Sequence, residues 1–185
     1  GTPGWDHHRA NSYNASELAV AIGISSNMQR NVLVKCKATG IPFEHGDFVE
    51  KRVFAPGHQY EAIARPWAEE IIGEELYASV FAADVDGLYL SASLDGHTLL
   101  NEVTWEHKQL NDTLAESLDA GIIPDEYHPQ MEQGLMLTGA TRCLFMASKG
   151  DRETMRFSWY ESNPDLRAKI IPTWKQLMAD VEAYV

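Results

Sequence analysis

The sequence predicts an α/β fold in which a β-sheet is flanked by helices, and three observations carry this prediction. Three segments before residue 73 place apolar residues at helical spacing. Short apolar and alternating runs then occupy residues 76–108, with an Asp-Gly pair between the first two, as is typical of strands joined by a hairpin. Two more strand-like runs precede a long amphipathic segment at the end of the chain.

The composition is that of an ordinary globular domain. The chain has 185 residues, of which 44% are hydrophobic and 23% charged, so we expect one domain spanning residues 1–185. No apolar run approaches membrane-spanning length and no signal-peptide pattern opens the chain, so the expected location is the cytoplasm, without membrane contact. Cys36 and Cys143 form no CxxC pair and are expected to be free, reduced thiols.

The formal net charge of −12 argues against indiscriminate nucleic-acid binding. It does not exclude an enzyme that acts on nucleic acid. Carboxylates that hold metal ions add to the acidic count, and the bound cations then offset them locally. A basic strip inside an oligomer would also leave the whole protein acidic.

The first two predicted helices are defined by their ends. Asn14 is a suitable N-cap residue and Glu17 stands three positions later, as in a capping box, so a helix is expected to run from there to Gly23. A second helix is predicted over residues 26–39, with Gly40 as its end.

A loop over residues 41–54 leads to a third predicted helix, 56–73, which Pro66 is expected to kink or to divide. The remaining predicted elements are, in order, strands 76–84, 88–93 and 99–108, helices 110–120 and 124–139, strands 141–148 and 154–160, and a helix over 163–185.

The stretch that carries the most chemistry runs from Asp95 to Lys108. Asp95 is expected in a turn before Gly96, and the strand that follows ends in Glu106-His107-Lys108. Side chains alternate along a strand, so Glu106 and Lys108 share a face and His107 points the other way. Two carboxylates suit Mg²⁺, and an adjacent ammonium can orient or deprotonate a water or bind phosphate. The plain alternative is an exposed strand with a solvated charged side.

Five other positions are candidates with equally plain alternatives. Ser16 lies in the first turn of a predicted helix, which favours an anion, and Arg9 just upstream could reach the same place, although a capping box with a surface arginine explains them as well. Glu61, in the first turns of the third helix, either compensates the helix dipole or adds a third carboxylate to the metal site. Tyr127 and Gln130 are three residues apart and share a helix face, which usually means packing beside a solvated amide.

Four short motifs follow one another along the chain. The first is Trp5 and Arg9 with Ala15-Ser16-Glu17, and the second is Gly57 and Glu61 with Ala64-Arg65. The third is Ser93, Asp95 and Gly96, followed by Glu106 and Lys108. The fourth is Tyr127 and Gln130, followed by Thr138-Gly139. Their order resembles the lambda-exonuclease-like viral recombinases, the phage alkaline exonucleases. That family has the PD-(D/E)XK restriction-endonuclease-like core, a central mixed β-sheet flanked by helices. The chain departs from the family in being compact and in offering Glu102 as a conceivable ligand, but only Glu106 has a lysine two residues on.

The resemblance implies a magnesium-dependent exonuclease, for which Mn²⁺ is expected to substitute. It would act on ends of double-stranded DNA, degrade the 5′-ended strand in the 5′-to-3′ direction, and leave a 3′ overhang for a phage single-strand annealing protein. Family members similar to lambda exonuclease form ring-shaped trimers, so a homotrimer in the cytoplasm of a bacterial host is expected.

The resemblance also implies roles for individual residues at the metal site. Asp95, Glu106 and the main-chain carbonyl of His107 would hold Mg²⁺, and Glu61 would support a second metal ion. Lys108 would position or deprotonate the attacking water.

Further residues would contact DNA. By similarity, Arg9 and Ser16 would bind the 5′-phosphate, and Gln130 and Tyr127 would line the site. Phe54 lies where the family places an apolar wedge that splits the terminal base pair.

Three other functions remain open from the sequence. One is a structure-specific or restriction-type endonuclease with the same fold. Another is a non-catalytic acidic protein that mimics DNA, and a third is a protein that binds DNA ends without cutting them.

Overall fold

The computed structural model describes residues 11–41 and 55–184, with side chains described from Gln59 onward in the second range. The elements are, in chain order, β1 (Tyr13–Asn14), the 3₁₀ helix η1 (Ala15–Glu17), α2 (Leu18–Ile22), α3 (Arg30–Thr39), α5 (Ala55–Ile72), β2 (Tyr77–Val85), β3 (Leu88–His97), β4 (Val103–Gln109), α6 (Asp112–Asp119), the 3₁₀ helix η3 (Asp125–Tyr127), α7 (His128–Thr138), β5 (Arg142–Ser148), β6 (Arg156–Glu161) and α8 (Pro164–Glu182).

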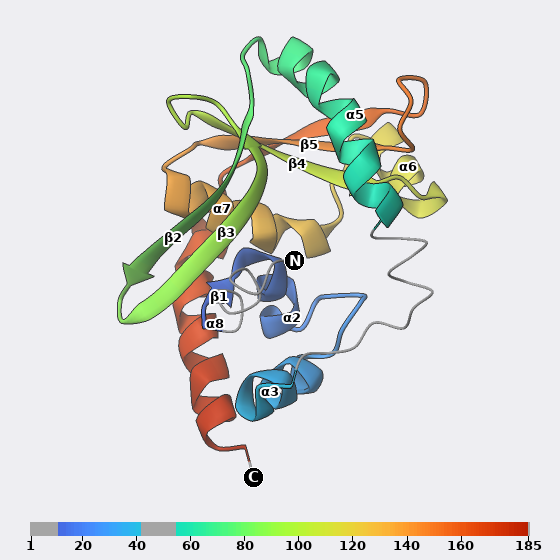
Figure 1. Cartoon of the computed structure of the whole chain (residues 1–185). Coiled ribbons are helices and arrows are strands. Elements are labelled where there is room, and N and C mark those ends of the chain that lie inside the picture. Colours follow the sequence, from blue (N-terminus) through green and yellow to red (C-terminus); the bar gives the residue numbers. More distant parts are fainter. Residues whose placement is uncertain (1–10, 42–54, 185) are drawn as a thin grey trace.

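The strands form one mixed sheet, which confirms the predicted fold class. Its order is β1-β3-β4-β5-β6, and β2 pairs with β3. The β1–β3 and β4–β5 pairs are parallel, whereas β2–β3, β3–β4 and β5–β6 are antiparallel. The long β2–β3 hairpin projects beyond the rest of the sheet (Figure 1).

Helices cover both faces of the central strands (Figure 1). On one face α5 buries Ala64 and Ala68 against Trp105, Leu144 and Met146 of β4 and β5. On the other face α6 and α7 pack on β5 and β6, in a cluster centred on residues such as Leu114, Leu135 and Phe145. The ends of β4 and β5 are thereby held between α5 and α7.

A second core joins the two ends of the chain. Helices α2, α3 and α8 pack around Trp174 and against the start of β3. The indole of Trp174 donates to Oε1 of Gln133, which lies on α7 (2.7 Å). Nε2 of Gln133 donates to the main-chain oxygens of Tyr13 and Ser91, at 2.8 and 2.9 Å. A buried amide thus fixes α7 to β1, β3 and α8.

The predicted Asp86-Gly87 hairpin turn is confirmed, but two strand boundaries were wrong. Asp86 and Gly87 have φ values of 54° and 82°, as the tight turns of twisted hairpins require. Strand β3 continues to His97, so Asp95 lies in a strand and not in a turn. The predicted strand 99–108 begins only at Val103, because residues 99–102 form the turn between β3 and β4.

The predicted capping box was also wrong. Residues 15–17 form a 3₁₀ turn before α2, and Asn14 makes no side-chain cap. Instead, Nδ2 of Asn14 donates to the main chain of Ser12 and to Glu17, while its Oδ1 accepts from Ser91. The side chain is recruited by a strand partner 77 residues away, so a local cap does not form.

Several other boundaries differ from the prediction. Helix α3 starts at Arg30, four residues later than expected, although Gly40 ends it as predicted. Helix α5 continues through Pro66 to Ile72 as one element. The predicted helix 124–139 is divided into η3 and α7, and the strand predicted at 154–160 begins at Arg156. In the described ranges, the helices are all too short or too polar to cross a bilayer.

Candidate active site

The site is built where β3 and β4 separate. The two strands pair only at Gly96–Trp105 and His97–Thr104. One step further along, the main-chain N–H of His107 donates to Oδ2 of Asp95 at 2.8 Å, in place of a main-chain partner on β3. The fork therefore fixes the Asp95 carboxylate against β4, although the sequence had suggested that a turn would do so.

Helix α7 completes one side of β4. Glu106 and Lys108 share a face, as alternation predicted, and Lys108 Nζ lies 2.6 Å from Glu106 Oε1. Gln130 of α7 donates from Nε2 to the same oxygen (2.6 Å) and accepts from Lys108 Nζ through Oε1 (3.2 Å). The three side chains form a closed hydrogen-bonded triangle, so the structure brings Gln130 to the predicted pair.

His107 points to the opposite side of β4, as predicted. Its Nε2 lies 2.9 Å from the hydroxyl of Ser148, which is fully buried on β5. Burial lowers the pKa of His107 to about 4, and the nearby Lys108 charge adds to the effect. The ring is therefore neutral at physiological pH and links the ends of β4 and β5.

Arg65 of α5 also belongs to the site, although no role was predicted for it. Its Nη2 donates to the main-chain oxygen of Asp95 (2.7 Å) and its Nη1 to that of Leu76 (3.1 Å). The guanidinium lies over the Trp105 ring, 5.2 Å from its centroid, and 3.5 Å from Glu61 Oε1. The sequence signals for this arrangement were the place of Ala64-Arg65 in the second motif and the spacing of Arg65 four residues after Glu61 on one helix face.

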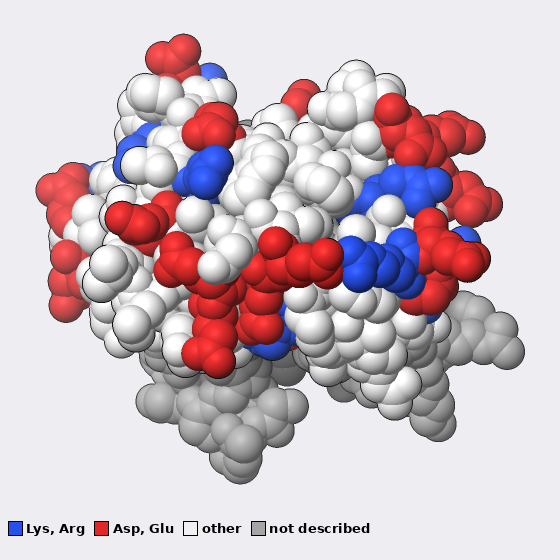
Figure 2. Space-filling view, turned by 90° about the horizontal axis from the view of Figure 1, so that it is seen from above, with Lys and Arg blue, Asp and Glu red and all other residues white. Residues whose placement is uncertain are grey.

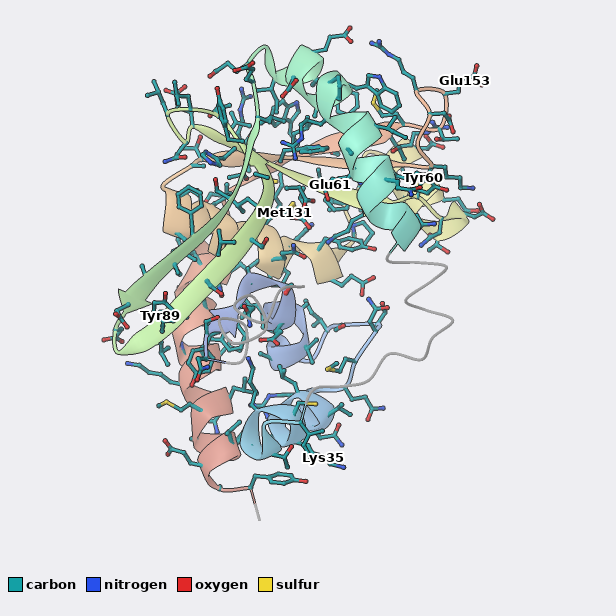
Figure 3. All side chains as sticks on the ribbon, viewed as in Figure 1. Lys35, Tyr60, Glu61, Tyr89, Met131 and Glu153 are labelled. Atoms are coloured by element: carbon teal, nitrogen blue, oxygen red, sulfur yellow. The ribbon has the colours of Figure 1, made fainter. Side chains whose placement is uncertain are left out.

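Glu61 approaches the site from α5. It projects from that helix toward the sheet, whereas Tyr60 lies on the side of α5 nearer the loop after β5 (Figure 3). Its charge is among the factors that raise the pKa of Asp95. It is not gathered into a three-carboxylate cluster, since the described ranges contain no set of three or more His, Cys, Asp or Glu side chains placed to hold a metal ion.

Burial gives the carboxylates unusual acidities. It raises the pKa of Asp95 to about 6, with a further increase from Glu61, and that of Glu106 to about 7, with a further increase from Asp95. Burial alone would lower the pKa of Lys108, but the two carboxylates outweigh it and the net shift is upward. Two desolvated acids beside one retained cation favour the binding of additional positive charge.

The donor set fits a hard divalent cation. Asp95 uses Oδ2 and Glu106 uses Oε1 for the hydrogen bonds above, and within the described residues no donor is assigned to Oδ1 of Asp95 or Oε2 of Glu106. Mg²⁺ typically takes one or two carboxylates and keeps several waters, so two carboxylates suffice. The neutral His107 ring points away, which leaves only its main chain on the metal side.

The remaining predicted residues have different outcomes. Tyr127 lies beside the site, with Lys108 Nζ 5.9 Å from its ring centroid and its ring 5.0 Å from that of Phe145. Ser16 is exposed on η1, which packs against α7. Glu102 is exposed in the turn before β4 and does not join the Glu106 face. Arg9 and Phe54 lie outside the described residues.

Comparisons with known proteins agree with the fold. The sequence profile of the YqaJ-like viral recombinase domain matches residues 4–141. The chain is similar to an alkaline exonuclease of Laribacter hongkongensis, LHK-Exo, with 21% identity, a TM-score of 0.79, and 98% of this chain and 93% of that chain covered. A complex of LHK-Exo with dAMP matches with 22% identity, a TM-score of 0.78 and the same coverage.

A third structure, a phage-related exonuclease from Haemophilus somnus 129PT, matches with 12% identity and a TM-score of 0.66, over 93% of this chain and 94% of that chain. No curated protein sequence matches significantly.

Proposed function

The chain belongs to the YqaJ-like viral recombinase family, and on that premise we propose that it is a metal-dependent exonuclease acting on ends of linear double-stranded DNA. It removes nucleotides from the 5′-phosphorylated strand in the 5′-to-3′ direction and leaves a 3′ overhang for a phage single-strand annealing protein. The observation that carries the proposal is the placement of Asp95, Glu106, Lys108 and Gln130 together at the β3–β4 fork. The similar LHK-Exo, crystallised with dAMP, supports a nucleotide-containing substrate.

The carboxylates supply the metal ligands. Asp95 and Glu106 would hold Mg²⁺, or Mn²⁺ in its place, with the main-chain carbonyl of His107, and Glu61 is the candidate for a second ion. When bound, such a cation would supply charge neutralisation at the scissile phosphate and a lowered pKa for a water. Arg65 keeps Asp95 in place by binding its main-chain oxygen, so the carboxylate does not have to reorganise.

Lys108 and Gln130 act on the water and the phosphate. Because the carboxylates raise the pKa of Lys108, the ammonium form prevails, which favours a role in positioning water and stabilising phosphate charge over one as a base. Gln130 contacts both Lys108 and Glu106, so it fixes their relative orientation. Tyr127 lines the site next to the ammonium.

The contacts with the DNA end are proposed on the family resemblance. Arg9 and Ser16 bind the 5′-phosphate, and Phe54 serves as the wedge at the terminal base pair. Packing of η1 on α7 supports the role of Ser16, since the same helix carries Gln130.

Assembly into a homotrimeric ring is proposed on the family resemblance alone, and the surface charge is compatible with it. On the face seen from above, Asp and Glu side chains make up most of the charged surface, and Lys and Arg form isolated groups among them (Figure 2). A protein with a formal charge of −12 is unsuited to holding DNA by its whole surface, but a ring can gather its basic groups along a channel.

The test uses linear duplex DNA with a 5′-phosphate on one end, a separate label on each strand, a covalently closed circle and an EDTA control. We expect only the 5′-phosphorylated strand to shorten in Mg²⁺, the circle to survive and EDTA to stop the reaction. Cutting of the circle would replace the proposal with an endonuclease. An absence of cleavage in both Mg²⁺ and Mn²⁺ would leave end binding or DNA mimicry.

A further inference from the structure

A second cation, Lys149, lies at the edge of the sheet from which the proposed site opens. Ala147 pairs with Lys108 in the β4–β5 ladder, and Lys149 follows two residues later, beyond the end of β5. Two residues of strand span about 7 Å. The backbone of Lys149 therefore lies within about 7 Å, along the chain, of the Ala147 that pairs with Lys108.

The loop that carries Lys149 is held by contacts with residues of β4 and α5 near the site. The Ser148 hydroxyl, which bonds to the His107 ring, also accepts from the N–H of Gly150 at 3.4 Å. Gly150 has φ +82°, and a Cβ there would lie 2.5 Å from Cδ1 of Tyr60 on α5. The absence of a side chain lets the Tyr60 ring pack directly on the loop backbone, so β4 and α5 both fix its position.

Hydrogen bonds within the loop also hold its backbone. The N–H of Lys149 donates to the hydroxyl of Thr154 (3.0 Å), and the N–H of Thr154 donates to the Asp151 carboxylate (2.7 Å). The backbone of Lys149 is thus held in place while its side chain extends outward. A fixed backbone reduces the conformational freedom that is lost when the side chain binds a ligand.

The side chain itself is available. Lys149 is 48% exposed and lies 3.7 Å from Asp112, whose side chain is 99% exposed. Exposed pairs of this length contribute little, and a phosphate would compete with them. By contrast, Lys108 is bonded to Glu106 and Gln130, and Arg65 to two main-chain oxygens.

We propose that Lys149 binds a DNA phosphate next to the scissile one, releasing Asp112 as it does so. This inference rests on the proposed function, since it requires DNA in the site. It adds a fixed backbone contact outside the metal-binding and 5′-phosphate-binding residues, and such a contact aids positioning without reading sequence.

The experiment compares Lys149→Ala with Lys175→Ala. Lys175 is a matched control, because it is 47% exposed and pairs with an exposed aspartate, Asp86, at the hairpin tip. Binding of a labelled duplex end is followed by fluorescence anisotropy over a series of salt concentrations. Ca²⁺ replaces Mg²⁺, and a gel verifies that the DNA stays intact.

Losing one phosphate contact should reduce the slope of log K against log salt by about 0.9 and should weaken binding at low salt. We expect this for Lys149→Ala, together with a raised KM and a largely unchanged kcat in Mg²⁺. Lys175→Ala should retain the wild-type slope. An equal slope for both variants and the wild type would overturn the proposal.

A substitution at Asp112 should change the affinity for DNA in the opposite direction. Asp112→Asn should tighten DNA binding in the wild-type background, because Lys149 no longer has to leave a carboxylate, and should have no effect in Lys149→Ala. A gain of equal size in both backgrounds would show only a general charge effect and would contradict the proposal. Cleavage by the wild type is scored separately, so a failure of the exonuclease proposal is distinguished from a failure of the Lys149 contact.

Discussion

Individual residues at the site are held by partners that are far away in the chain. Gln130 meets Glu106 across 24 positions, and Arg65 reaches the main-chain oxygen of Asp95 across 30. Each bond removes freedom from a group that must be placed before the reaction begins, and such preorganisation is a large part of catalysis. The effects of substitutions should therefore be sharper on activity than on stability.

Lys108→Ala and Asp95→Ala should each reduce cleavage by about 10²-fold or more, because one removes the cation at the phosphate and the other a metal ligand. Initial rates on end-labelled duplex DNA measure the loss. Lys175→Ala, which changes an exposed lysine elsewhere, should cleave normally. Wild-type rates in either site variant, once folding has been verified by circular dichroism, would show that the site is misassigned.

Arg65→Ala should lower kcat more than it raises KM, because the Arg65 guanidinium is bonded to the main-chain oxygen of Asp95 and acts through the position of that carboxylate. The substitution leaves the main-chain oxygens of Asp95 and Leu76 without the donors that Arg65 supplies. The cost in unfolding free energy is about 1–3 kcal/mol. Arg65→Lys keeps the charge but cannot reach both oxygens with one planar group, so it should restore stability better than kcat. Equal recovery of both would contradict a positioning role.

Among the elements, α7 has to serve both the site and the core. Gln130 faces β4, while Glu132 and Gln133 are fully buried on other sides of the helix. Glu132 accepts from the hydroxyls of Tyr160 and Ser162, and its other partners are the N–H of Asn163 (2.8 Å) and Nε of Arg167 (2.6 Å). The start of α8 is thereby tied to the helix that positions Gln130.

Glu132→Ala should destabilise the protein by about 3 kcal/mol or more, because it leaves the Tyr160 hydroxyl and the Arg167 guanidinium without their buried partner. Glu132→Gln retains two acceptor positions at most, so its free energy of unfolding should lie between that of Glu132→Ala and that of the wild type. Urea unfolding followed by tryptophan fluorescence measures both. A loss below about 1 kcal/mol for Glu132→Ala would show that the helix ends rearrange to satisfy these groups.

At the scale of the whole molecule, the chain is acidic, with a formal net charge of −12, and two of its carboxylates, Asp95 and Glu106, are buried at the proposed site. In the metal-free protein, burial holds the pKa of Asp95 at about 6 and that of Glu106 at about 7, above the ordinary carboxyl range. Raised values mean that the folded state binds these protons more tightly than the unfolded state. The resulting stabilisation is complete below the unfolded-state pKa and is lost as pH rises through 6 and 7.

Metal-free protein should therefore unfold at a lower temperature at about pH 8 than at about pH 5, and Mg²⁺ should raise the unfolding temperature more at the higher pH, because it binds the ionised carboxylates. Thermal unfolding with EDTA or Mg²⁺ at the two pH values measures this. Glu106→Gln, which cannot ionise there, should flatten both dependences. A stabilisation by Mg²⁺ that is equal at both pH values would place the metal elsewhere.

The sequence by itself determined the α/β class, the Asp86-Gly87 hairpin and the shared face of Glu106 and Lys108. These depend on periodicity and on spacings of a few residues, which local geometry fixes. Gly40 and Asn163 likewise end and begin their helices as local rules predict. Glu102 was an open alternative only because sequence spacing does not show where a strand begins.

Only the tertiary structure decided how the site is assembled. The β3–β4 fork, the approach of Gln130, the role of Arg65 and the anchoring of the Lys149 loop all join segments that are far apart in the chain. The same competition from distant partners moved Asn14 from its predicted cap to a contact with Ser91. Local propensity is worth a fraction of a kcal/mol per residue, whereas a buried polar group left without a partner costs about 1–3 kcal/mol, so distant partners determine the outcome where the two disagree.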